Sequence, residues 1–217
     1  GQQMPCPIRF KVFGDLNTTR ISTIYAGVNS EFTEVIWFYP SADSEENDSY
    51  VVYNYGENVW YYGKLSRTAW LDRGVRDFPQ ATGVESNPYL YNHESGNDND
   101  GSAITAFVES SQFDIGQGDQ FSFVDRLIPD LTFDGSTGVD PTATFTIQAR
   151  NFPGATYDQS QSAGVTKTAT TPIQQFTNQA FLRVRGRSIS LKVSSDAEGV
   201  QWRLGVPRLN IRPDGRR

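Results

Sequence analysis

Carboxylates are the side chains in this sequence with the clearest capacity for chemistry, because 25 acidic residues stand beside one histidine and one cysteine. A pair of carboxylates is the catalytic device of glycoside hydrolases, but no two acids are singled out by their spacing. Four acids gather in residues 41–49, a segment too charged to be buried. We interpret it as a solvated loop, with a cation site or a partner-facing loop as alternatives. Its acids are Asp43, Glu45, Glu46 and Asp48.

A second oxygen-rich stretch, residues 96–102, has the sequence GNDNDGS. Oxygen-bearing side chains at alternate positions followed by a glycine resemble the first half of a calcium-binding loop. The glutamate that an EF-hand requires does not follow at the necessary spacing. We therefore interpret this stretch as a flexible turn and as a linker loop between two domains.

Other catalytic and metal-binding patterns are missing from the sequence. One histidine, His93, excludes most zinc sites, and one cysteine, Cys6, excludes an internal disulfide framework. No nucleophile elbow, phosphate-binding loop or dinucleotide fingerprint is present. Arg67, Asp72 and Arg73 are interpreted as a structural network of ion pairs and hydrogen bonds. The sequence thus predicts no enzyme, no catalytic residue, no metal and no cofactor, and His93 is expected to be a surface or structural residue.

Short strands must position the charged side chains within and next to residues 34–72. Residues 35–39 are a continuous apolar run ended by a proline, which predicts a strand buried on both faces. Residues 50–55, 59–62 and 67–71 follow as further strands, after one predicted at 21–28. Four short aromatic strands within about 40 residues fit one blade of a β-propeller. The predicted blade core contains Trp37, Trp60 and Trp70.

After residue 102 the pattern changes to plain alternation. Residues 142–149 place alanine, phenylalanine and isoleucine on one face and threonine on the other, as in a half-buried antiparallel strand. Residues 103–109 and 121–127 predict further strands, and 202–206 supply the last. A two-residue turn at Gly186 and Arg187 predicts a hairpin in which every inward pair is apolar. Those pairs are Val184 with Ile189, Leu182 with Leu191 and Ala180 with Val193, while Phe181 points outward among cations and suggests a covered surface.

Charge is distributed unevenly along a chain whose net charge is −6. Residues 1–100 carry 7 basic and 14 acidic side chains, residues 101–182 carry 3 and 8, and residues 183–217 carry 9 and 3. The acidic body argues against general nucleic-acid binding, whereas the basic end suits an acidic neighbour, another subunit or a phosphate. We expect the end to be an extended tail that contacts another subunit. The candidate interface residues are Arg208, Leu209, Ile211, Arg212, Arg216 and Arg217.

These patterns together predict an all-β protein. Residues 1–95 are expected to form a partial β-propeller of one or more blades, and residues 96–102 a linker loop. Residues 103–207 are expected to form an antiparallel, β-sandwich-like domain, followed by a basic tail at 208–217. No apolar run reaches the length of about 20 residues that a membrane span requires.

Two stretches carry a resemblance to a known family. They are EVIWFYPSADSEENDSYVVYNYGENVWYYGKLSRTAWLDRGV in the predicted blade and FLRVRGRSISLKVSSDAEGVQWRLGVPRLNIRPDGRR at the end, whose closing W-R-L-G-x-P-R-L-x-I-R-P-D-G-R-R is the most specific part. The sequence resembles the C-terminal portion of tail hub or nozzle proteins of short-tailed bacteriophages. These are also called packaged-DNA stabilisation proteins or tail tubular proteins.

The resemblance implies a structural virion protein at the head-to-tail channel that helps to retain packaged DNA and to conduct it at ejection. It implies a homo-oligomeric ring, with sixfold symmetry expected, and contacts with other tail and portal proteins. DNA would pass through without sequence-specific binding. The protein would be made in the host cytoplasm and reside in the virion. Members of this family are several times longer, and the family supplies no catalytic residue.

Two other functions remain open from the residues alone. Surface aromatic side chains can stack on sugars, so the chain could be a carbohydrate-binding or receptor-binding module of a virion. The many carboxylates leave a glycoside hydrolase as a further alternative. Tryptophan-dependent glycan binding would favour the first, and turnover lost on mutating one carboxylate would favour the second.

Overall fold

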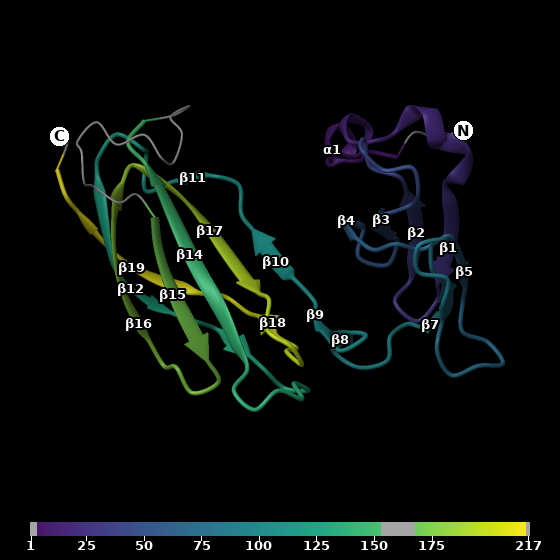
Figure 1. The fold of residues 1–217 in the computed structure, drawn as a ribbon. Helices are drawn as coiled ribbons and strands as arrows, with labels where there is room; N and C mark the ends of the chain where they lie inside the picture. The colour runs from purple at the N-terminus through teal and green to yellow at the C-terminus, as the bar shows by residue number, and fades with distance from the viewer. Residues whose placement is uncertain (1–3, 153–167, 216–217) are drawn as a thin grey trace. The chain divides into compact units, whose positions relative to one another are not determined.

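Antiparallel strands make up almost all of the secondary structure, which confirms the predicted all-β class (Figure 1). The computed structural model describes residues 4–152 and 168–215. In this part there are one α-helix, α1 (Arg9–Gly14), one 3-10 helix, η1 (Thr18–Thr23), and nineteen strands. The chain divides into two units, unit 1 (1–95) and unit 2 (96–217). None of the described helices has the length and apolarity needed to cross a membrane.

Unit 1 contains a four-stranded antiparallel sheet in which each strand pairs with its neighbour in sequence. Alternation along the second and third strands puts Ile36, Phe38 and Val52 on one face, where all three are buried. This face is the core of the unit. The strands are β1 (Tyr25–Asn29), β2 (Glu34–Tyr39), β3 (Ser49–Asn54) and β4 (Val59–Lys64).

A second, three-stranded sheet of unit 1 supplies the other side of this core. Trp70 on its first strand packs against Phe38, with ring centroids 6.0 Å apart. The indole Nε1 of Trp70 donates a hydrogen bond to the backbone oxygen of Val28 at 2.9 Å. A Cβ atom at Gly27 would lie 2.5 Å from the Trp70 ring, so only glycine permits this approach. The strands are β5 (Ala69–Leu71), β6 (Gln80–Thr82) and β7 (Leu90–Asn92).

The predicted blade therefore needs two corrections. Residues 67–71 were expected as its fourth strand, but β5 belongs to the second sheet, and β1 completes the first. Residues 21–28, expected as one strand, divide between η1 and β1. The first difference arises because a pattern of short strands indicates where strands occur but not which strand pairs with which. The second arises because the Asn17 side chain accepts a hydrogen bond from the Thr19 N–H and caps the start of η1.

The three tryptophans expected in one core lie on two different faces. Trp70 is 9% exposed and joins the core. Trp37 is adjacent in sequence to the inward Ile36 and Phe38, so strand alternation turns it to the opposite face. There it stacks on Trp60 with centroids 6.0 Å apart, and both side chains are half-buried. The prediction of a common core is thus wrong for Trp37 and Trp60.

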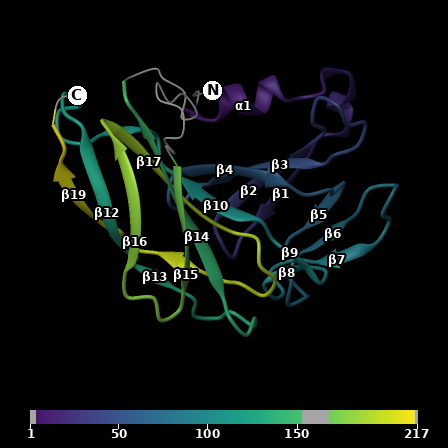
Figure 2. The same ribbon diagram turned by 60° about the vertical axis from the view of Figure 1, so that its left-hand side comes forward.

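Unit 2 has two larger sheets that share one hydrophobic core. The order of the first is β10-β17-β14-β15, with β11 also paired to β17, and the order of the second is β16-β12-β19. Figure 2 shows β12 lying between β16 and β19. The strands of the first sheet are β10 (Ala106–Glu109), β11 (Phe113–Asp114), β14 (Thr142–Arg150), β15 (Thr168–Gln174) and β17 (Ser188–Ser195). Those of the second sheet are β12 (Ser122–Ile128), β16 (Ala180–Gly186) and β19 (Arg208–Pro213).

The hairpin predicted at Gly186 and Arg187 is wrong in its pairing. β16 pairs with β12, whereas β17 pairs with β14 and β10, so the chain crosses from one sheet to the other at Arg187. The backbone N–H of Arg187 donates to the oxygen of Arg150 at 2.8 Å, and a Cβ at Gly186 would lie 2.7 Å from that of Ala149. The faces were nevertheless predicted correctly, since Val184 and Ile189 are both buried.

Two segments expected to lie outside the domains are part of unit 2. Residues 96–102, interpreted as a flexible linker, contain one strand of a short hairpin and the start of the other, and the Asp98 carboxylate accepts a hydrogen bond from the Gly199 N–H. Residues 208–213, expected as an extended tail, form β19 along the edge of β12. Two further short strands pair with each other. These elements are β8 (Asp98–Asn99) with β9 (Ser102–Ala103), and β13 (Leu131–Thr132) with β18 (Arg203–Leu204).

Candidate functional site

The outer face of sheet β16-β12-β19 in unit 2 carries several arginine side chains and an exposed phenylalanine. Along β16, Leu182 and Val184 point into the core, so that Phe181, Arg183 and Arg185 point outward. Arg126 on β12 and Arg212 on β19 join them there. We call this surface the basic face, defined by Arg126, Arg183, Arg185 and Arg212.

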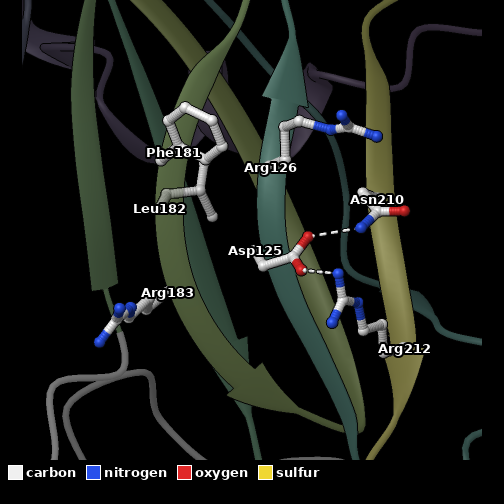
Figure 3. A pocket seen from close by; sticks show the side chains of 7 residues that line it. All are labelled: Asp125, Arg126, Phe181, Leu182, Arg183, Asn210 and Arg212. Atoms are coloured by element: carbon white, nitrogen blue, oxygen red, sulfur yellow. Dashed lines mark hydrogen bonds and ion pairs between the residues drawn. The ribbon is translucent and has the colours of Figure 1, made fainter.

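A bulge in β12 shapes the middle of the basic face. Val124 and Arg126 face consecutive residues of β19, Ile211 and Asn210, so Asp125 is an extra residue between them. As a result, Asp125 and Arg126 both line one groove instead of pointing to opposite faces (Figure 3). The volume of this groove is ≈ 570 Å³. Its lining comes from β12 (Asp125, Arg126), β16 (Phe181, Leu182, Arg183) and β19 (Asn210, Arg212).

Asp125 is fully engaged by the edge strand. The side-chain amide of Asn210 donates to its Oδ1 at 2.6 Å, and the guanidinium of Arg212 lies 3.0 Å from its Oδ2. The Arg212 side chain is 69% exposed, so this ion pair contributes little to stability, on the order of 0.2–1 kcal/mol. Its effect is to fix the positions of Asn210 and Arg212 along the groove.

Arg126 differs from the other arginines of the basic face because one of its donors, the Nε–H, is buried and has no partner. In the part of the chain that the structure describes, it makes no hydrogen bond and no ion pair, and its Nε–H is shielded from solvent. The side chain extends toward β19 beside Asn210, whereas Arg183 extends away from the other groups (Figure 3). The Nε–H of this half-buried guanidinium is thus a buried donor without a partner, which an anionic acceptor would satisfy.

The rest of the basic face combines cations with aromatic rings. Arg185 forms an ion pair with Asp214, and its guanidinium lies 4.0 Å from the ring centroid of Phe121. Arg187 lies over the same ring at 4.8 Å. Phe181, which lies opposite Arg126 at the other end of β16, is 74% exposed. The face therefore offers both charge and apolar area to a partner.

The predicted interface residues are placed on β19 instead of on a free tail. Leu209 packs against the core, whereas Arg208, Ile211 and Arg212 are exposed. Arg216 and Arg217 lie outside the described residues. Sequence reasoning missed Arg126, although two consecutive polar residues within an otherwise alternating strand signal a bulge.

The acidic loop at 41–49 bonds within unit 1. Asp48 accepts hydrogen bonds from the Ser41 N–H at 2.8 Å and the Ser41 hydroxyl at 2.7 Å, and Lys64 lies 3.2 Å away. Burial alone would raise the pKa of Asp48, but these donors outweigh it and lower the pKa. Glu45 pairs with Arg20, and Glu46 accepts from a backbone N–H. No group of three or more acidic, histidine or cysteine side chains in the described residues is arranged to bind a metal.

Arg67 and His93 form a buried network beside Trp70. Arg67 is 6% exposed, its Nε donates to the Nε2 of His93 at 2.9 Å, and its guanidinium lies 3.9 Å from the ring centroid of Tyr91. The rings of His93 and Trp70 are 4.9 Å apart. Burial, and then the charge of Arg67, lower the pKa of His93 to about 4. Neutral His93 therefore acts as the acceptor that holds Arg67 in place.

This network predicts that unit 1 loses stability as the pH falls from about 6.5 to 4. In that range the unfolded chain binds a proton at His93 and the folded chain does not, so the free energy of unfolding decreases. Since the ring is partly exposed, we expect a loss of about 1–2 kcal/mol. Urea unfolding followed by tryptophan fluorescence across this range measures it. His93→Gln keeps an acceptor for Arg67 but does not titrate, so an equal pH dependence in both proteins would refute the assignment.

Comparison of the sequence with protein-family models gives no match. Comparison with curated proteins gives no match either.

Proposed function

We propose that this chain is a structural virion protein of a short-tailed bacteriophage, part of the tail hub or nozzle, which helps to retain packaged DNA and to conduct it at ejection. The observation that carries the proposal is the basic face of unit 2. Four arginines and the exposed Phe181 gather there on a protein with a net charge of −6. Such a surface suits docking to an acidic partner subunit. The resemblance of residues 34–75 and 181–217 to this family supplies the setting.

The sheets of the two units are compatible with propeller blades and a β-sandwich. An antiparallel sheet of order β1-β2-β3-β4 is the topology of a propeller blade, and β5-β6-β7, which covers its core face, would belong to the next blade. The two sheets of unit 2 around one core would form a β-sandwich. Two blades do not close a ring, so further blades would come from elsewhere in a longer chain or from other copies.

The proposed partners follow from the charge. The basic face would dock to other copies in a ring, expected to be sixfold, and to neighbouring tail or portal proteins. DNA would pass without base-specific contacts, because residues 1–100, with 7 basic and 14 acidic side chains, repel phosphate. The protein would be made in the host cytoplasm and reside in the virion.

Self-assembly tests this proposal. We expect sedimentation velocity to show a closed oligomer that dissociates as salt is raised, since its contacts are charged. Negative-stain imaging should show rings, and the double variant Arg183→Glu with Arg185→Glu should sediment as a folded monomer. The double variant Lys11→Glu with Arg76→Glu, which reverses two exposed cations of unit 1, is the matched control.

Two results would contradict the proposed structural role. A protein that stays monomeric at low salt and binds glycans in a tryptophan-dependent manner would replace the structural role by carbohydrate recognition. Turnover of a glycan that one carboxylate substitution abolishes would instead make it a glycoside hydrolase.

A further inference from the structure

Arg126 lines a groove of ≈ 570 Å³, and its buried Nε–H has no acceptor there. The nearest carboxylate of the groove is Asp125, but both of its oxygens are taken by Asn210 and Arg212. With its oxygens bonded to β19, Asp125 forms no ion pair with Arg126. The groove is thus charged and lacks an acceptor for that charge.

The chemistry of Arg126 selects a planar oxyanion. A guanidinium presents parallel N–H groups that match the two oxygens of a carboxylate, and such charge-assisted pairs are about twice as strong as neutral hydrogen bonds. Asn210 faces Arg126 on β19, and Arg212 lies two residues further along the same strand (Figure 3). Their remaining N–H groups can meet the same ligand.

An apolar position lies directly beside the charged one. Phe181 is the cross-strand partner of Arg126 and is 74% exposed. Along an extended peptide, side chains two residues apart lie about 7 Å from each other on one face. A segment with an acidic residue two positions from an apolar one would therefore reach Arg126 and Phe181 together.

We propose that this groove binds an extended acidic segment of a partner protein, with a carboxylate on Arg126 and an apolar side chain on Phe181. The inference rests on the docking role proposed for the basic face and specifies the chemistry of the partner. It does not depend on whether that partner belongs to a virion.

Duplex DNA fits these observations less well. Nucleic-acid binding draws on several phosphate contacts at once, but in this groove Arg212 is already paired with Asp125, and Arg183 points away from Arg126. The exposed phenyl ring of Phe181 offers area to a side chain, not to a phosphate.

NMR of the arginine Nε–H groups tests the proposal on the whole protein. The probe is the peptide acetyl-Glu-Ser-Leu-Ser-amide, and the Arg126 signal is assigned by its loss in Arg126→Lys. We expect a saturable shift of that signal with a Kd of about 1 mM or tighter. Exchanging glutamate for glutamine in the peptide should weaken binding about tenfold or more. Arg126→Gln should do the same, with the affinity of this variant measured from the backbone amide shifts of β12 and β16 because the reporter signal is lost. Phe181→Ala should weaken it about threefold to tenfold.

The controls separate the outcomes. Arg203→Gln, an exposed arginine on β18 away from the groove, should leave the affinity unchanged. No shift at about 10 mM peptide would overturn the proposal. It would equally be overturned if inorganic phosphate shifted Arg126 as strongly as the peptide, or if a short DNA duplex did so in a salt-dependent manner. If the protein binds the peptide but forms no ring, the proposed ligand of the groove stands and the proposed virion role is refuted.

Discussion

Replacement of Trp70 by alanine should destabilise unit 1 by about 3–5 kcal/mol. The side chain is 9% exposed and packs against Phe38 and His93, so its removal leaves a large cavity at the junction of two sheets. It also leaves the backbone oxygen of Val28 without the indole donor. Gly27, which lies against the indole, has no side chain that could fill the space. Chemical denaturation monitored by far-ultraviolet circular dichroism measures the loss.

The other two tryptophans of unit 1 serve as matched controls. Trp37 and Trp60 are half-buried and stack on each other away from the core. We expect alanine at either position to cost about 1–2 kcal/mol, because less apolar area is withdrawn from water. If all three variants lose the same stability, the assignment of two distinct faces is wrong.

Deletion of residues 208–217 should destabilise unit 2 by about 4 kcal/mol or more. The deletion removes the ladder between β19 and β12, which the backbone bonds between Phe121 and Asp214 or Gly215 extend. It removes Leu209 from the core and exposes a row of unpaired N–H and C=O groups on β12. For a unit of this size the loss should lower the melting temperature by more than about 10 °C.

A point substitution separates the contribution of the β19 backbone ladder to stability from that of its charged side chains. Arg212→Gln breaks the exposed ion pair with Asp125 but keeps the backbone ladder, so we expect a change below about 1 kcal/mol. A synthetic peptide of residues 208–215, added in trans, should restore part of the stability of the truncated protein. A truncated protein that melts at the temperature of the intact one would show that the segment is dispensable for folding.

Sequence patterns located most strands because burial leaves a periodic signal. The continuous apolar run at 35–39 and the alternation at 142–149 correspond to β2 and β14 within one residue. Residues 50–55 and 59–62 correspond to β3 and β4 within two residues. β2, β3 and β14 each bury side chains, and this burial imposes the pattern, whereas β4 has no fully buried residue.

Pairing could not be predicted in the same way. Alternation places Val184 and Ile189 in the core, and this is equally true whether their strands are neighbours in one sheet or face each other from two sheets. The glycine at 186 suggested a tight turn, but its physical role is to allow close contact with Ala149 where the chain crosses between sheets. Local sequence carries no information on that difference.

Only part of the candidate site could be predicted from the sequence. Arg212 was singled out because the last residues are rich in arginine. Arg126 lies in an acidic part of the chain and reaches the same groove through the bulge in β12 and through pairing with a strand far along the sequence. Charge counted along the chain cannot reveal a cluster that the sheet assembles from three separate segments.

During synthesis, the sheet β16-β12-β19 must form later than the sheet of unit 1. β1 to β4 pair with their immediate neighbours in sequence, so this sheet can form as soon as they have emerged from the ribosome. β12 receives both of its partners from segments translated much later. Until Pro213 has emerged, β12 keeps an open edge with apolar side chains, and such an edge can pair with other nascent chains. The rate at which the segment from β16 to β19 is translated therefore sets how long newly made chains are exposed to misassembly.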